Sequence, residues 1–161
     1  MLDRSGVPSR EQVLSVFPSR DKLISLKAVI ECYEEIPCNP CETYCPFDAI
    51  TIGERINNRP LLSVDKCVGC GICVSVCPGV AIMLAKEAEN TASFTIAYEF
   101  YPLPKVNETW LALNRSGEVI GEALVTRVTN NPAQDHSALI SVECPKELLY
   151  EFVSIRRADH E

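Results

Sequence analysis

The sequence predicts an α+β protein in which a duplicated, cysteine-rich unit is followed by a mostly β region. Eight of the nine cysteines fall between residues 32 and 77. In the same stretch the pattern Cys-Pro-x-x-Ala-Ile occurs twice, at 45–50 and 77–82. From about residue 92 onward, apolar and polar positions alternate instead, which is typical of strands with one buried face.

The repeat predicts two similar units. Strands are expected before the cysteines of each unit, at 28–31 and 60–64, and again after them, at 51–53 and 83–85. A short helix is expected directly after the last cysteine of each unit, because proline suits the first helical turn. Two copies indicate a pair of units related by a pseudo-two-fold axis, since a solenoid needs more repeats.

Three segments follow from this pattern. Residues 1–26 form an N-terminal arm with a short helix over 11–17, and residues 27–90 form the cysteine-rich domain. Residues 91–161 form a small β-rich domain that ends in a short helix over 145–153.

The composition limits the function classes. A net charge of −7 disfavours nucleic-acid binding, which requires a basic surface. The amino terminus has no apolar core of a signal peptide, so we expect no secretory signal and a cytoplasmic protein. The uncharged run 67–85 is interrupted by glycine and proline, so we expect no membrane span. We find no catalytic residues, neither paired carboxylates nor a Ser/His/Asp set, so enzymatic activity of the chain alone is uncertain.

The second cysteine group has the spacing C-x2-C-x2-C-x3-C-P at 67–78. This run is typical of bacterial ferredoxins, in which three cysteines hold one [4Fe–4S] cluster and the fourth binds the other cluster. Gly69 and Gly71 allow the backbone to approach the cluster closely.

The first group fits the same run except at its start, because five residues separate Cys32 from Cys38 where two are usual. Two clusters with exchanged fourth ligands are therefore expected. The first cluster is assigned to Cys32, Cys38, Cys41 and Cys77, and the second to Cys67, Cys70, Cys73 and Cys45, with Gly69, Gly71, Pro46 and Pro78 in the cluster environment. Because of the longer gap before Cys38, a three-iron cluster that lacks Cys32 as a ligand is the alternative at this site.

The surroundings of the two clusters differ. The first loop carries Glu34, Glu35 and Glu42, and Pro37 and Pro40 remove two N–H donors. Negative charge and fewer N–H···S bonds disfavour the added electron, so we expect the first cluster to have the lower reduction potential.

Other uses of the cysteines are weaker hypotheses. Structural zinc on the C-x2-C pairs would leave Cys73 and Cys77 unexplained, and disulfides are unexpected in a reducing compartment. Cys144 is expected to be a plain buried thiol. His136 and His160 are expected on the solvated surface.

From residue 28 to about 86 the chain resembles two-cluster bacterial ferredoxins. The resemblance implies an α+β fold of two strand–loop–helix–strand halves with a cluster at each end. More narrowly, the segment ECYEEIPCNPC at 31–41 and the appended β region resemble the small ferredoxin-like subunit of FAD-dependent amine or imino-acid dehydrogenase complexes, of the proline, hydroxyproline and sarcosine-oxidase-like group. This narrower resemblance implies a hetero-oligomer in which a flavoprotein subunit carries FAD or FMN.

The leading hypothesis is therefore an electron-transfer subunit of such a complex, which relays electrons from a partner's flavin to an acceptor. A free-standing soluble ferredoxin is the alternative, and a non-redox zinc-binding interaction module is a remote one.

Overall fold

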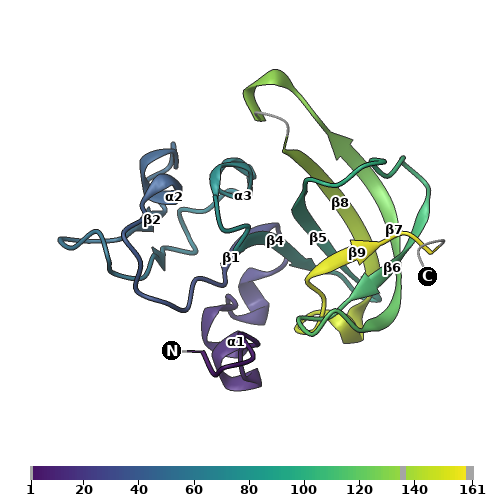
Figure 1. Cartoon of the computed structure of the whole chain (residues 1–161), viewed down its shortest axis with the longest axis horizontal. Coiled ribbons are helices and arrows are strands. Elements are labelled where there is room, and N and C mark those ends of the chain that lie inside the picture. Colours follow the sequence, from purple (N-terminus) through teal and green to yellow (C-terminus); the bar gives the residue numbers. More distant parts are fainter. Residues whose placement is uncertain (1, 135–136, 159–161) are drawn as a thin grey trace.

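The computed structural model describes residues 2–134 and 137–158. Figure 1 shows loops that carry the cysteine motifs at one end and a large, twisted sheet at the other. In chain order the elements are α1 (Arg10–Val16), the 3-10 helix η1 (Arg20–Lys22), β1 (Lys27–Ile30), α2 (Pro40–Thr43), β2 (Ile50–Thr51), β3 (Leu61–Leu62), α3 (Ile72–Val76), β4 (Ile82–Glu87), β5 (Thr91–Tyr98), β6 (Thr109–Leu113), β7 (Val119–Thr129), η2 (Pro132–Gln134), β8 (Ala138–Pro145), η3 (Lys146–Leu148) and β9 (Ser154–Arg156). His136 and His160 lie outside the described residues.

Most of the strands belong to one antiparallel sheet. Its seven strands have the order β1-β4-β5-β8-β7-β6-β9. The two strands that the cysteine-rich segment supplies to this sheet, β1 and β4, pair with each other, and β4 also pairs with β5. Residue 90, where the sequence predicts a domain boundary, lies in the turn between β4 and β5, so the sheet continues across that position.

Strands β1 and β4 separate two hydrophobic cores. Val29 and Met83 point into the larger core with the strands of the C-terminal region. Their neighbours Ala28, Ile30 and Leu84 point into a second core, which also contains Cys41, Cys67 and Cys73. Because successive side chains of a strand point to opposite faces, a strand between two cores is apolar at every position. The cysteine loops are thereby fixed against one face of the sheet.

The N-terminal arm contains the expected short helix. Ser9 caps α1, because its hydroxyl accepts from the Gln12 amide, and the Gln12 side chain accepts in return from the Ser9 amide at 2.8 Å. Val13 is buried, and the Phe17 ring contacts Tyr150 edge-on with centroids 5.0 Å apart. The arm therefore packs onto the larger core.

The strand pairing reflects the duplication. β1, the first strand of the first unit, pairs with β4, the last strand of the second. β2, the last strand of the first unit, pairs with β3, the first strand of the second, in a separate two-stranded sheet. Each unit thus supplies one strand to each pair, as a pseudo-two-fold arrangement requires.

The C-terminal region differs from its sequence-based expectation after β8. The helix expected over 145–153 is only the 3-10 turn η3, and the chain then forms β9, which the sequence did not predict. β9 pairs with β6, and the amide of Val153 donates to Leu113 O at 2.9 Å. The backbone N–H and C=O groups at this edge of β6 require hydrogen-bond partners on an extended strand, so the chain leaves the helical turn after η3.

Candidate metal centres

Each cysteine motif contains one short helix, and the helix lies before the last cysteine of its motif. α2 begins at Pro40 and contains Cys41, which is buried. α3 begins after Gly71, whose φ of 85° is left-handed, and contains the buried Cys73. The helices therefore bring the middle cysteines of the two motifs inward.

The helices expected after the last cysteines are absent from the described residues, and this expectation was wrong. Tight turns stand in their place. In each turn the residue three after the cysteine has positive φ, 48° at Asp48 and 50° at Val80, which stops a right-handed helix. The next amide donates to the cysteine sulfur, from Ala49 to Cys45 Sγ at 3.4 Å and from Ala81 to Cys77 Sγ at 3.3 Å.

These turns make the two halves alike in geometry as well as in sequence. The N–H···S bonds occupy corresponding positions of the repeat and differ by only 0.1 Å in length. Such bonds stabilise thiolate charge on a metal-bound sulfur. The Cys-Pro-x-x-Ala pattern is thus a turn that directs a backbone amide to its own cysteine.

The structure brings the eight cysteines together in two groups of four. One cavity is lined by Cys32, Cys38, Cys41 and Cys77. Another is lined by Cys45, Cys67, Cys70 and Cys73. Each cavity therefore takes three cysteines from one motif and the last cysteine of the other, which is the grouping that the sequence predicts for the two clusters.

The residues expected around the clusters lie in the same cavities. Gly69, Gly71 and Pro46 line the cavity of Cys45, Cys67, Cys70 and Cys73. Pro78 lines the other cavity. The two cavities are otherwise lined mainly by apolar side chains, which limits the access of water.

Burial makes three of these thiols weaker acids in the absence of metal. It raises the pKa of Cys41 to about 11 and that of Cys73 to about 12, and neighbouring cysteines add to both effects. The pKa of Cys32 is raised as well, first by burial and then by Cys77 and Cys38. Four thiolates at such close quarters repel one another, so each cavity requires positive charge to hold them deprotonated.

The donor sets fit iron–sulfur clusters better than zinc. Among the described residues, no group of three or more His, Cys, Asp or Glu side chains is arranged to hold a single metal ion. A cubane separates its four ligand sulfurs more widely than one ion does, because the cube itself lies between them. Four sulfurs around one apolar cavity suit the larger group.

The eight cysteines differ in exposure. Cys70 is exposed, whereas Cys41, Cys67 and Cys73 are buried and the remaining four are intermediate. Cys67 Sγ also accepts from the amide of Ala28 at 3.4 Å. The cavity of Cys45, Cys67 and Cys73 therefore also contains the most exposed of the eight motif cysteines, Cys70.

Cys144 lies apart from both groups, as expected for a plain buried thiol. It is in β8 and is 4% exposed, and its Sγ contacts Ala92 O at 3.8 Å. Burial raises its pKa to about 12.

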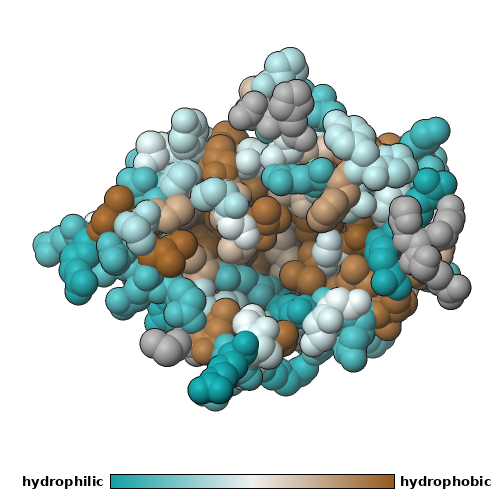
Figure 2. Space-filling model, viewed as in Figure 1, coloured by the Kyte–Doolittle hydropathy of each residue, from teal (hydrophilic) through white to brown (hydrophobic). Residues whose placement is uncertain are grey.

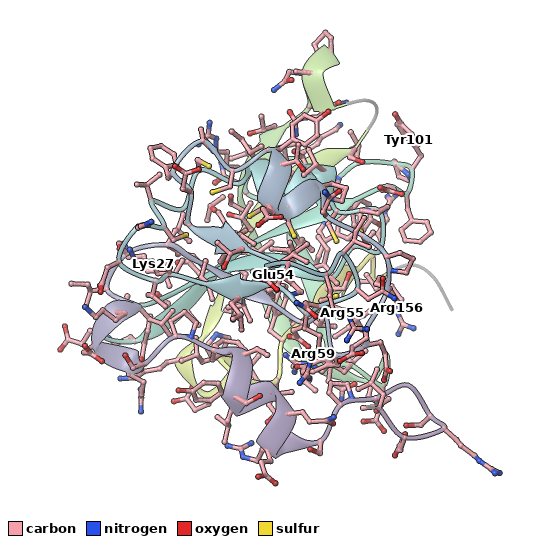
Figure 3. All side chains as sticks on the ribbon, turned by 90° about the vertical axis from the view of Figure 1, so that its left-hand side faces the viewer. Lys27, Glu54, Arg55, Arg59, Tyr101 and Arg156 are labelled. Atoms are coloured by element: carbon pink, nitrogen blue, oxygen red, sulfur yellow. The ribbon has the colours of Figure 1, made fainter. Side chains whose placement is uncertain are left out.

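Sequence reasoning missed the polar contacts on both sides of Cys32. Glu31 forms a largely buried ion pair with Arg115, a residue of the turn between β6 and β7. The carbonyl of Tyr33 accepts from Arg59 Nη1 at 3.4 Å. Arg55 and Arg59 both belong to the loop between β2 and β3, at the cysteine-motif end of the molecule (Figure 3). No sequence pattern links these residues, because Glu31 and Arg115 are 84 positions apart.

A third cavity of about 350 Å³ lies beside this ion pair. Its lining includes Glu31, Arg115 and Tyr33, and the turn from Gly79 to Ala81 that follows Cys77. Figure 2 shows a hollow with hydrophobic side chains near the middle of the visible face.

In the part of the chain that the structure describes, no helix is long and apolar enough to cross a membrane.

In a comparison with known protein families, the segment that contains the cysteine motifs matches one family model. Residues 36–79 match the family model of the 4Fe-4S dicluster domain. The matched range contains seven of the eight motif cysteines and begins after Cys32. No solved structure matches the chain significantly.

Curated relatives share the same part of the chain. One subunit of the Na(+)-translocating ferredoxin:NAD(+) oxidoreductase complex of Acetobacterium woodii is 34% identical over 84 residues, 52% of this chain and 25% of the relative. The ferredoxin-type protein NapF of Haemophilus influenzae is 32% identical over 47% of each chain. One subunit of the NADH-quinone oxidoreductase of Pelobacter propionicus is 32% identical over 37% of each chain. The chain thus spans about a quarter to a half of these relatives, and it carries a 4Fe-4S dicluster domain of the ferredoxin type.

Proposed function

We propose that this chain transfers electrons as a subunit of an oxidoreductase complex, by means of two [4Fe–4S] clusters. Cys32, Cys38, Cys41 and Cys77 hold the first cluster, and Cys45, Cys67, Cys70 and Cys73 hold the second. The observation that carries the proposal is the exchange of one cysteine between the two four-cysteine cavities. When bound, the clusters supply one-electron chemistry.

The chain itself positions and insulates these centres. Its apolar cavity walls exclude water, and its N–H···S bonds from Ala28, Ala49 and Ala81 stabilise thiolate charge. Cys70 is the exposed ligand, so the second cluster is the one nearer to a docking partner.

A partner complex is supported by the parts of the chain beyond the cluster domain. A bare electron carrier does not require the arm 1–26 or the region 91–161, which we propose is a β-rich domain appended to the dicluster domain of 27–90. The names of two relatives describe them as oxidoreductase subunits, and one of these names specifies a complex. We propose a hetero-oligomer, and we place the free-standing ferredoxin second.

The finer proposal for the partner is a flavoprotein. It rests on the resemblance of residues 31–41 to ferredoxin-like subunits of amine and imino-acid dehydrogenases. In this proposal FAD or FMN is bound by the partner, which oxidises the substrate, and this chain passes the electrons on.

The first cluster has the lower potential in this proposal. Its loop carries the carboxylates of Glu34, Glu35 and Glu42, whose negative charge disfavours the added electron. Backbone N–H···S bonds do not separate the two sites, because they occur at Cys41 and Cys77 on one side and at Cys45 and Cys67 on the other. Arg59 opposes the effect of these carboxylates, since its charge favours the thiolate of Cys32, but Arg59 is exposed and therefore screened by solvent.

The test is purification of the full chain from its native source without oxygen, with all co-eluting chains identified. We expect about eight irons and eight sulfides per chain, co-elution with a flavoprotein, and a lower EPR-monitored potential for the first cluster. Protein that binds zinc but no sulfide would refute the cluster proposal. Elution as an iron–sulfur monomer would favour the free ferredoxin.

A further inference from the structure

A largely buried ion pair joins the first cysteine motif to the turn between β6 and β7. Glu31 directly follows β1 and precedes Cys32, while Arg115 lies in the turn between β6 and β7. Arg115 Nε donates to Glu31 Oε2 at 2.7 Å, and Arg115 Nη2 donates to Glu31 Oε1. Their side chains are only 9% and 12% exposed. This is the bidentate geometry in which arginine fixes the orientation of a carboxylate.

Arg115 is itself held firmly on the C-terminal side. Its Nη1 donates to Tyr150 O at 2.7 Å and also contacts Glu151 O at 3.4 Å. The turn that carries it is closed by Asn114, whose Oδ1 accepts from the amides of Ser116 and Glu118, each at 2.9 Å. These contacts hold the guanidinium in place independently of Glu31.

The same contacts continue to the other side of Cys32. The Tyr33 hydroxyl donates to Glu31 Oε2 at 3.3 Å, and the Tyr33 ring is buried. The backbone amide of Glu31 donates to Ala81 O at 2.8 Å, in the turn region that follows Cys77. Both sequence neighbours of Cys32 therefore contact the ion pair: Glu31 is one of its members, and Tyr33 donates to the Glu31 carboxylate.

This support falls at the most irregular point of the cysteine motif. Five residues separate Cys32 from Cys38, and a longer loop has more conformations to lose when it closes on a cluster. Because Glu31 and Tyr33 are held in place, the Cys32 end of this loop has fewer conformations to lose.

We propose that Arg115 is a positioning residue for Cys32, so that the turn between β6 and β7 forms part of the first cluster site. The inference rests on the proposed function, since it requires Cys32 to be a cluster ligand. Without Arg115, the iron at the Cys32 corner becomes the labile one, while the second cluster is unaffected.

The test is Arg115→Gln in the full chain, with Arg20→Gln as the matched control. Arg20 also makes a two-point ion pair with a carboxylate, that of Glu87 at the end of β4, but neither residue adjoins a cysteine. Both purified proteins are titrated with ferricyanide and followed by EPR. A [4Fe–4S]²⁺ cluster that gives one electron to ferricyanide and loses Fe²⁺ becomes [3Fe–4S]⁺, which has its own EPR signal.

We expect Arg115→Gln to form at least several-fold more [3Fe–4S]⁺ than wild type at equal oxidant, to a limit of one such cluster per chain. Arg20→Gln should match wild type. Equal yields from Arg115→Gln and wild type would overturn the inference. The proposed function fails separately, if wild-type protein holds no iron and sulfide.

A double variant separates positioning from stability. Arg115→Gln alone leaves the Glu31 carboxylate buried without its partner, which destabilises the fold. Glu31→Gln combined with Arg115→Gln removes that charge, so the melting temperature should recover while the high [3Fe–4S]⁺ yield remains. If the yield returned to the wild-type value together with the melting temperature, the pair would be structural only.

Discussion

At the scale of single residues, burial alone explains the raised pKa of the Cys144 thiol. Its thiol donates to the Ala92 carbonyl and lies in the larger hydrophobic core, and Cys144 lines neither of the four-cysteine cavities. The folded protein holds the Cys144 proton more tightly than the unfolded chain does, because burial raises its pKa from 9.0 to about 12.

This shift predicts an alkaline loss of stability. Below pH 9 the thiol is protonated in both states and contributes nothing to the pH dependence. Between pH 9 and 12 the unfolded chain releases the proton first, so the free energy of unfolding falls by up to about 1.4 kcal/mol per pH unit. Melting temperatures of anaerobic protein from pH 8 to 10.5 should fall more steeply for wild type than for Cys144→Ala. Parallel curves would contradict the assignment.

At the scale of elements, the cysteine loops are fixed by contacts with the segments beside them. Gly69 has a φ of 72°, and a Cβ atom at that position would lie 2.4 Å from Leu26 O and 2.7 Å from Leu26 Cβ. The sequence predicts this glycine for a close approach between backbone and cluster. The structure adds a second reason, which is the close packing of the loop against the residue just before β1.

A glycine substitution therefore tests the second cluster selectively. In Gly69→Ala the new methyl group clashes with backbone, and the left-handed φ adds strain. We expect loss of about four irons per chain, measured by iron analysis, with the first cluster's EPR signal retained.

Gly79→Ala is the control, because Gly79 lines the other cavity, its φ is not left-handed, and a Cβ there meets nothing within 4 Å. It should keep the wild-type iron content. Full iron content in Gly69→Ala would show that the loop can move away from Leu26.

At the scale of the whole molecule, the exchanged cysteines make the two motifs interdependent. Cys77 follows α3 of the second motif but lines the cavity of Cys32, Cys38 and Cys41. Cys45 lines the opposite cavity in the same way. The two halves are also joined by the β1–β4 and β2–β3 pairs.

The exchange predicts a crossed effect of mutation. Cys77→Ser should disturb the first cluster, although Cys77 belongs to the second motif, and Cys45→Ser should disturb the second. Redox titrations followed by EPR identify the cluster that is altered, and Cys144→Ser serves as the thiol control. An effect of Cys77→Ser on the cluster of Cys67, Cys70 and Cys73 would contradict the proposed ligand sets.

The sequence by itself determined the dicluster domain and most of the strands, and it predicts the two ligand sets that the proposed function uses. It could do so because iron–sulfur ligands have characteristic local spacing and strands alternate over a few residues. It failed in the turns after Cys45 and Cys77, where an N–H···S bond and positive φ replace the helix that proline suggests.

Only the tertiary structure decided how the C-terminal region meets the cluster domain. The continuation of one sheet from β4 into β5, the strand β9, and the pair of Glu31 with Arg115 all join segments that are distant in sequence or that compete with local propensity. Such contacts are selected by burial and by the need to satisfy backbone and charged groups in the assembled fold, and these needs leave no periodic pattern in the chain.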